Sequence, residues 1–238
     1  MAVKLTRQGA IAHLLIDRPA KANALDSPLL EALAGALEAM EAGVRAVVLA
    51  GSGKAFCGGA DIHELRALDA ASAGAFVGRI HRVCESVRRL PVPVVARLHG
   101  AVIGAGLEIA AACDLRIAAE GTRFAMPEVR LGIPSVVEAA LLPRLMGSGR
   151  AAWLVLTGEA IDARRAYEWG LIEEVCSPES LDERLSHLVN MLIACDAEAL
   201  AQQKRLLQLW DDAPLEVSIA ESIERFAQMP KHRRRLAP

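Results

Sequence analysis

The fold of this chain is decided by two glycine-rich turns, GAVIGAGLE at residues Gly100–Glu108 and AFCGGADI at residues Ala55–Ile62. Each turn ends an apolar run and opens a predicted helix. The first N–H groups of a helix have no intrahelical partner, and glycine lets a ligand approach the backbone closely. Two such turns could therefore direct two backbone donors at one oxygen atom. The sequence predicts an oxyanion hole at this place.

The composition is that of a globular protein with a substantial core. The chain has 238 residues, of which 53% are hydrophobic, and its formal net charge is −2. Aromatic residues make up only 3%. Nucleic-acid binding without base specificity uses a basic field and stacking rings, so we expect no nucleic-acid partner. The basic run at Lys231–Arg235 is predicted to be a solvated tail.

The N-terminal segment and the cysteines indicate the compartment. Residues Met1–Ile16 carry several polar side chains, and their apolar run is too short for a signal peptide or a membrane span. We therefore expect a cytoplasmic protein with no membrane partner. The five cysteines are odd in number and lack CxxC spacing, which predicts free thiols rather than disulfides or a zinc site.

Short apolar runs alternate with helical patterns along much of the chain. The runs that predict strands are Ile11–Ile16, Ala46–Ala50, Val94–Leu98 and Leu115–Ala118. This alternation favours βαβ-type connections and an α/β fold. We divide the chain into an α/β core, residues 1–190, and a C-terminal helical segment, residues 191–238.

The helical patterns are bounded by caps and prolines. A first helix is predicted to begin at Asp26 or Ser27, and one helical pattern runs from Asp61 to Arg89. A short apolar helix is expected at Ile109–Cys113. Nearly everything from about residue 135 onward is predicted to be helical. The last segment, Asp196–Met229, is amphipathic and packs either on its own core or on a neighbouring subunit.

Two glutamates could complete a site around the turns. Glu108 lies one helical turn beyond Ala105 if the helix begins there, and Glu128 follows the next strand in a loop. The N–H groups of Ala60 and Ala105 could hold a thioester oxygen, each lowering the barrier to proton transfer at Cα by about 3 to 4 kcal/mol. Two carboxylates in an apolar pocket raise each other's pKa and can act as acid and base. This arrangement suits the addition of water to an activated double bond.

Each signal also has an ordinary structural explanation. A glutamate on a helix is usually solvated or salt-bridged. Cys57 is predicted to be a small packing residue because no His/Asn partner is evident. The glycine spacing of Gly100–Gly106 is GxxxGxG rather than GxGxxG, which argues against a dinucleotide site. His63 and His99 flank the turns without a third ligand, so we expect no metal site.

These motifs resemble the crotonase, or enoyl-CoA hydratase/isomerase, family over nearly the whole chain. The resemblance rests on RPAKANAL at Arg18–Leu25, FCGGADI at Phe56–Ile62, GAGLE at Gly104–Glu108 with Cys113-Asp114, PEVRLG at Pro127–Gly132, and the region Thr157–Val175. It implies a ββα spiral core with a helical C-terminal trimerisation region. It also implies a homotrimer or a hexamer.

The resemblance further implies the substrate and its contacts. An acyl-CoA thioester is expected at the N–H groups of Ala60 and Ala105, with coenzyme A as part of the substrate and no separate cofactor. The CoA portion is expected near the residues of two segments: Lys21, Ala22, Ala24, Asp61, Ile62 and His63. In hydratases of the family both glutamate positions are occupied, and we assign Glu108 to water activation and Glu128 to the Cα proton.

One segment departs from the family's pattern. Where the family usually carries Ile-Pro-Gly-Ala-Gly-Gly, this chain has GIPSVVEAA at Gly132–Ala140, one residue shorter before the proline. Val136 and Val137 are bulkier than glycine, and Glu138 adds a carboxylate, so we expect a reshaped acyl end of the pocket. Glu138 could instead be a salt-bridged helix residue.

Three functions are consistent with these features. The leading prediction is a 2-enoyl-CoA hydratase, because both glutamates accompany both predicted donors. The alternative is a Δ3,Δ2-enoyl-CoA isomerase or another crotonase-type lyase that uses one carboxylate as a proton shuttle. A noncatalytic acyl-CoA-binding protein is the third hypothesis, against which the intact glutamate pair argues.

Overall fold

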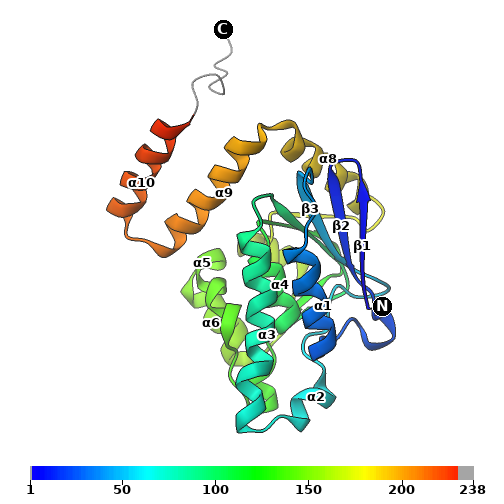
Figure 1. The fold of residues 1–238 in the computed structure, drawn as a ribbon. Coiled ribbons are helices and arrows are strands. Elements are labelled where there is room, and N and C mark those ends of the chain that lie inside the picture. The colour runs from blue at the N-terminus through cyan, green and yellow to red at the C-terminus, as the bar shows by residue number, and fades with distance from the viewer. Residues whose placement is uncertain (1, 230–238) are drawn as a thin grey trace.

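The computed structural model describes residues 2–229, and its main sheet contains six strands within that range (Figure 1). The spatial order of these strands is β1 (Val3–Gln8), β2 (Ile11–Ile16), β3 (Ala46–Gly51), β4 (Val94–Leu98), β6 (Leu115–Ala119) and β9 (Glu174–Cys176). A two-residue turn at Gly9 and Ala10 makes β1 and β2 an antiparallel hairpin. All other neighbouring strands of this sheet are parallel. The four predicted strands are confirmed to within one residue at each end.

A second, smaller sheet pairs β5 (Ala101–Ile103), β7 (Arg123–Ala125) and β8 (Ile161–Asp162) within the same described part of the chain. Its strands come from units that also supply the main sheet: β4 is followed at once by β5, and β6 by β7. After β5 the chain turns into α4 (Ala105–Ala112). This repeated ββα winding confirms the predicted crotonase-like spiral core. The sequence patterns missed β1 and the short strands β5, β7, β8 and β9.

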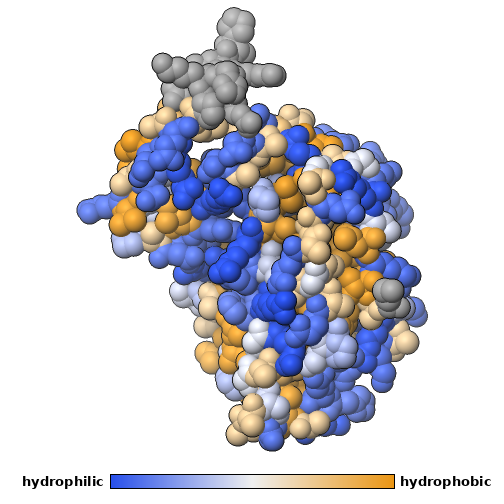
Figure 2. Space-filling model, in the orientation of Figure 1, coloured by the Kyte–Doolittle hydropathy of each residue, from blue (hydrophilic) through white to orange (hydrophobic). Residues whose placement is uncertain are grey.

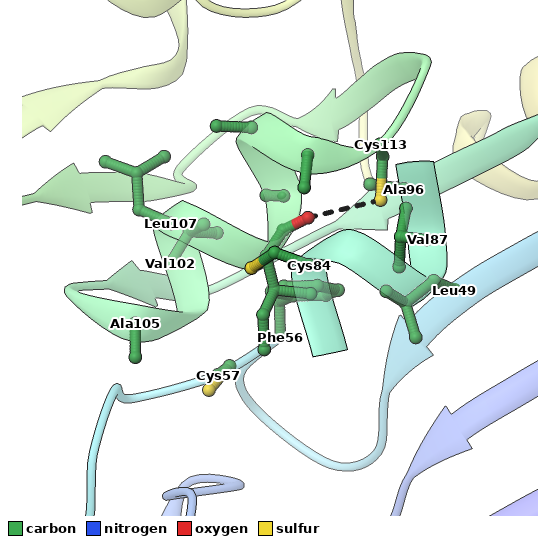
Figure 3. Close-up of a cluster of buried hydrophobic side chains, with 14 of the residues drawn as sticks. Leu49, Phe56, Cys57, Cys84, Val87, Ala96, Val102, Ala105, Leu107 and Cys113 are labelled. Atoms are coloured by element: carbon green, nitrogen blue, oxygen red, sulfur yellow. Dashed lines mark hydrogen bonds between the residues drawn. The ribbon is translucent and has the colours of Figure 1, made fainter. Parts of the chain in front are cut away.

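The main core lies between the main sheet and the helices α1 (Ser27–Glu38), α3 (Ala70–Arg89) and α4. Side chains alternate along each strand, so Val47 and Leu49 of β3 enter this core while Val48 faces the opposite side. Figure 3 shows part of the core, with side chains of β3, α3 and α4 in contact. Helix α8 (Leu181–Ala194) covers the opposite face.

Two helix predictions need correction. The pattern at residues 61–89 is two helices, α2 (Ile62–Ala67) and α3, because Asp69 caps a new helix by accepting from the N–H groups of Ala71 and Ser72. The helix expected at Ile109–Cys113 begins four residues earlier, at Ala105. Its start is fixed by Gly104, whose φ of 52° is a left-handed conformation that suits glycine.

The C-terminal part is less uniformly helical than predicted, because β8 and β9 return to the two sheets. The other helices are η1 (Pro19–Lys21), η2 (Glu128–Leu131), η3 (Val137–Leu141), α5 (Leu142–Met146), α6 (Ser148–Thr157), α7 (Ala163–Glu168), α9 (Ala197–Asp212) and α10 (Leu215–Gln228). Helices α9 and α10 form a hairpin at one end of the molecule (Figure 1). The predicted boundary at residues 190/191 falls within α8 and stays a prediction, and the basic run Lys231–Arg235 lies outside the described residues.

Helix α9 is attached to the core by a buried lysine. Lys204 is 4% exposed, and its ammonium group donates to Asp114 Oδ2 at 2.7 Å and to the carbonyls of Val87 and Val92 at 3.0 Å each. These bonds satisfy all three donors of the ammonium group. In residues 2–229, no helix combines the length and the apolar character needed to cross a membrane.

Candidate active site

The two glycine-rich turns lie side by side. Cys57 bridges to Val102 of β5: its N–H donates to the Ala101 carbonyl, and its carbonyl accepts from the Ile103 N–H, both at 3.0 Å. Gly59 adopts φ +94° and packs on the Ile103 carbonyl so closely that a Cβ there would lie 2.9 Å from the oxygen. Gly59 is therefore required in the motif, because a residue with a side chain does not fit between the two turns.

Each turn presents one backbone donor to a common cavity. Ala60 and Ala105 both line a cavity of about 260 Å³. Among the hydrogen bonds of residues 2–229, neither of their N–H groups donates to a protein acceptor, whereas the neighbouring Asp61 and Glu108 N–H groups bond to Leu25 and Gly104 carbonyls. Two free N–H groups in the wall of one cavity can hold an oxygen that gains negative charge.

The two predicted glutamates line the same cavity. Glu108 of α4 is 4% exposed, and its Oε1 accepts from the Ala139 N–H at 3.1 Å. Glu128 begins η2, and its Oε2 accepts from the Ser135 hydroxyl at 2.9 Å. The structure thus brings together the four residues that the sequence proposed as catalytic.

Burial raises the pKa of Glu108 to about 8, and the charge of Glu128 and then of Glu138 adds to this shift. The hydrogen bond from the Ala139 N–H acts in the opposite direction, because it stabilises the ionised carboxylate. Glu108 can therefore exchange a proton near neutral pH, which an exposed glutamate does not do.

The rest of the cavity wall is largely apolar. It includes Phe76 and Ile80 of α3, and Ile133, Pro134 and Val136 of the segment before η3. A neighbouring groove of about 690 Å³ shares the last three of these residues and extends along α2. The site therefore has an apolar extension beside the carboxylates.

The predicted CoA loop lies against the first turn. Ala22 and Asn23 adopt left-handed φ angles of 49° and 58°, and the Ala22 carbonyl accepts from the Gly58 N–H at 2.8 Å. Asn23 is fully buried, and its amide group donates to the Ser52, Ala55 and Phe56 carbonyls. The loop is therefore shaped by an asparagine whose amide group is enclosed by backbone carbonyls.

Arg18 connects this loop to the start of α2. Its guanidinium group bonds to Asp61 at 2.7 Å, to Asp26 at 3.1 Å and to the Ala24 carbonyl at 2.8 Å. The hydrogen bond from Arg18 holds the pKa of Asp61 below its usual value. Asp61 also caps α2 by accepting from the His63 N–H at 2.9 Å.

The predicted CoA-contact residues divide into two groups. Ala60, Ile62 and Ala105 line the cavity. The others do not form its wall and lie at or next to η1 and the start of α2: Lys21, Ala22, Ala24, Asp61 and His63. Lys21 and His63 are exposed to solvent.

Several contributors to the site were not selected from the sequence. Arg18 and Asn23 belong to the motif at Arg18–Leu25, but their bonds to Asp61 and to the carbonyls after β3 join residues that are far apart in the chain. Ser135 and the Ala139 N–H lie in the segment that departs from the family's pattern. That departure was the feature of the sequence that could have indicated their place in the site. Burial raises the pKa of the Cys57 thiol to about 12, which agrees with its predicted packing role.

Across residues 2–229, no three His, Cys, Asp or Glu side chains gather in a way that could hold a metal ion. The carboxylates and backbone N–H groups that line the cavity can combine acid–base catalysis with hydrogen bonding to an oxygen.

Comparison with known proteins identifies the family of this chain. The family model for enoyl-CoA hydratase/isomerase matches residues 6–235. Short-chain-enoyl-CoA hydratase of Clostridium acetobutylicum is 32% identical over 230 residues, which cover 95% of this chain and 88% of the relative. Trans-2-decenoyl-(acyl-carrier-protein) isomerase of Streptococcus mutans is 34% identical over 189 residues, 76% of this chain and 72% of the relative.

A solved structure leads to the same family. The crystal structure of an enoyl-CoA hydratase from Mycobacterium smegmatis has a TM-score of 0.93 to this chain at 32% identity, covering 95% of this chain and 90% of that one. The chain belongs to the enoyl-CoA hydratase/isomerase, or crotonase, family of enzymes.

Proposed function

We propose that this protein is a 2-enoyl-CoA hydratase, which adds water across the 2,3 double bond of a 2-enoyl-CoA thioester. The observation that carries the proposal is that two free backbone donors and two carboxylates line one cavity: Ala60, Ala105, Glu108 and Glu128. Water addition needs both an acid and a base, and a pair of carboxylates supplies them.

The backbone donors act on the thioester carbonyl. The N–H groups of Ala60 and Ala105 bind its oxygen, which draws electrons from the double bond and makes Cβ electrophilic. When water attacks Cβ, negative charge develops on the same oxygen as an enolate. Fixed donors in an apolar cavity stabilise this charge more than the neutral carbonyl, which lowers the barrier.

The glutamates move the protons. Glu108, in its ionised form, takes a proton from water as the water oxygen bonds to Cβ. Glu128 donates its proton to Cα, which collapses the enolate to the 3-hydroxyacyl thioester. One π bond is replaced by a C–O and a C–H bond, and the pair's single proton moves from Glu128 to Glu108. Transfer of this proton from Glu108 back to Glu128 then restores the two carboxylates to their starting state.

The segments around η1 and the start of α2, beside the cavity, are proposed to bind the CoA portion. Lys21 and His63 are exposed there and can reach phosphate groups, whereas Ala22 and Ala24 offer backbone groups in a shaped loop. No separate cofactor enters this mechanism, since coenzyme A arrives with the substrate. The groove of about 690 Å³ that adjoins the cavity offers apolar space for an acyl chain.

The C-terminal hairpin supports assembly into a homotrimer or a hexamer. Helix α10 exposes large apolar side chains, among them Leu215 at 74% and Ile223 at 66%. Figure 2 shows hydrophobic residues beside hydrophilic ones over this hairpin, and α9 and α10 line a groove of about 600 Å³. A patch of this kind is typical of a surface that a partner covers, and we propose that further copies of this chain cover it.

A panel of 2-enoyl-CoA and 3-enoyl-CoA thioesters of different chain length tests the proposal. Hydration removes the absorbance of the conjugated thioester, and mass spectrometry detects the added water. We expect turnover of 2-enoyl-CoA that is lost in both Glu108→Gln and Glu128→Gln. An unchanged rate in both variants would reject the mechanism, and binding of the panel without turnover would favour a noncatalytic acyl-CoA-binding protein.

A Δ3,Δ2-enoyl-CoA isomerase is the second candidate, because a relative that is 34% identical bears an isomerase name. Isomerisation moves one proton between two carbon atoms and needs no water. Conversion of 3-enoyl-CoA to 2-enoyl-CoA, with one glutamate variant retaining full activity, would favour this function over hydration.

A further inference from the structure

The segment that departs from the family's pattern forms η3, which packs against both α3 and α4. Its Ala139 N–H donates to Glu108 Oε1 at 3.1 Å. Because this bond fixes one oxygen of Glu108, the position of η3 decides how that carboxylate is aimed in the cavity. A displaced base can lose much of its catalytic effect.

The η3 segment needs support to hold this position. Val137, its first residue, has a φ of +41°, a left-handed conformation that β-branched residues rarely adopt. No side chain caps the N-terminus of η3. A conformation of this kind persists only where surrounding contacts impose it. The contacts of the next residue, Glu138, therefore help to explain how η3 is held in position.

Glu138 is a buried carboxylate that does not line the cavity. It is 6% exposed, and its Oε1 lies 2.7 Å from Nδ1 of His81, which donates to it. Within residues 2–229, its Oε2 is buried without a hydrogen-bond partner. Burying a carboxylate is unfavourable unless its contacts compensate, and the contact with His81 joins η3 to α3.

His81 occupies the part of α3 that forms the cavity wall. It follows Ile80, which lines the cavity, and its own side chain is 54% exposed. The other groups that face Glu138 are Cys84 of α3, whose thiol pKa is raised by burial and then by the Glu138 charge, and Glu108 of α4. The nearby Arg82 bonds instead to Glu31 and Glu38 of α1.

We propose that the hydrogen bond between His81 and Glu138 is a latch that holds η3 on α3 and so positions the Ala139 N–H on Glu108. The latch makes His81 and Glu138 positioning residues, since neither lines the space for the substrate. This role rests on the proposed function of Glu108 as the base that activates water.

The test begins with His81, whose half-exposed side chain can be replaced without opening the core. We expect His81→Leu to lower kcat for hydration by about 10-fold to 100-fold while KM stays unchanged, because the base is misaligned and the binding surface is intact. His81→Asn restores most of kcat, since its amide nitrogen occupies the place of Nδ1. Arg82→Leu, which breaks exposed ion pairs on the same helix, is the matched control and keeps full activity.

A double-mutant cycle identifies the contact. Glu138→Leu is expected to lower kcat as much as His81→Leu, and the double variant no further, because each change opens the same latch. Additive losses, or an Asn variant as impaired as the Leu variant, would overturn the proposal.

An NMR experiment tests the latch without measuring turnover. In ¹⁵N-labelled protein, the Ala139 amide shift should follow the titration of Glu108 near pH 8, the value set by its raised pKa. His81→Leu should abolish that dependence and His81→Asn should keep it. If the dependence survives in His81→Leu, the latch is rejected even when hydration is confirmed. If hydration fails but the dependence is lost, only the proposed function is rejected.

Discussion

The Cα atom of Gly104 faces the carboxylate of Glu128 so closely that a methyl group on it would overlap Oε1. The same glycine has φ 52° and ψ −125° and begins the helix that carries Ala105 and Glu108. Gly104 therefore sets the geometry of the Ala105 N–H and, because it has no side chain, leaves room for the carboxylate of Glu128.

Gly104→Ala should reduce kcat by about 100-fold, because the methyl group displaces Glu128 and the backbone is strained. The free energy of unfolding should fall by about 1 to 3 kcal/mol. Gly78→Ala in α3 is the control, since nothing lies within 4 Å of a Cβ placed there. Steady-state kinetics and urea unfolding measure both effects, and an active Gly104→Ala would contradict the assigned contact.

The hydration rate should fall as the pH rises above about 8. The two carboxylates share one proton, which rests on Glu108 because burial raises its pKa to about 8 and which Glu128 must receive before it can donate to Cα. Above this pH the shared proton is lost, and none remains for Cα. The measurement is kcat against pH with 2-enoyl-CoA, with circular dichroism at each pH to confirm that the fold persists. A rate that stays flat to pH 10 would show that no proton of this pair limits turnover.

Glu108→Gln should stabilise the fold at alkaline pH. Because burial raises the folded pKa of Glu108 to about 8 from 4.5, its contribution to stability is fully present below pH 4.5 and is lost as the pH rises through 8. Ionising it at pH 9 costs roughly 3 to 5 kcal/mol, which an amide does not incur. Urea unfolding should give the variant a larger free energy of unfolding than the wild type at pH 9 and a similar one at pH 5. The exposed Glu159→Gln serves as the control without a pH-dependent difference.

Lys204→Met should lower the free energy of unfolding by about 3 kcal/mol, because it leaves Asp114 without its buried ammonium partner. Helix α9 should then exchange its amide hydrogens faster than α3. The exposed neighbour Arg205→Met should leave both measurements unchanged. Equal stabilities of the two variants would mean that the lysine does not anchor α9.

Ile223→Glu should dissociate the proposed oligomer, because a charge placed on the exposed apolar face of α10 opposes its burial between copies. Light scattering after size exclusion should change from a trimer or hexamer mass to the mass of a single chain, one third of the trimer. Glu216→Ala on the same helix is the control and keeps the assembled mass. A monomeric wild-type protein would reject the proposed assembly.

Local features of the sequence determined the α/β class and the position of the turns. Apolar runs such as Val94–Leu98 predict strands because a buried parallel strand is apolar on both faces. Glycines predict the turns because positive φ and close backbone approach are local needs. The short strands β5, β7, β8 and β9 escaped prediction because two or three residues carry too little periodicity.

Glu108 and Glu128 were predicted as a pair from two motifs, but the environment of the pair came from the tertiary structure. Burial and the charge of Glu128, twenty residues away in the chain, raise the pKa of Glu108. The contacts from Ser135 and Ala139 depend on how η3 packs against α3 and α4. The sequence by itself determined which groups are present and which turns expose them. Only the tertiary structure decided their separation, burial and hydrogen-bond partners, because these quantities arise from packing between segments that are distant in the chain.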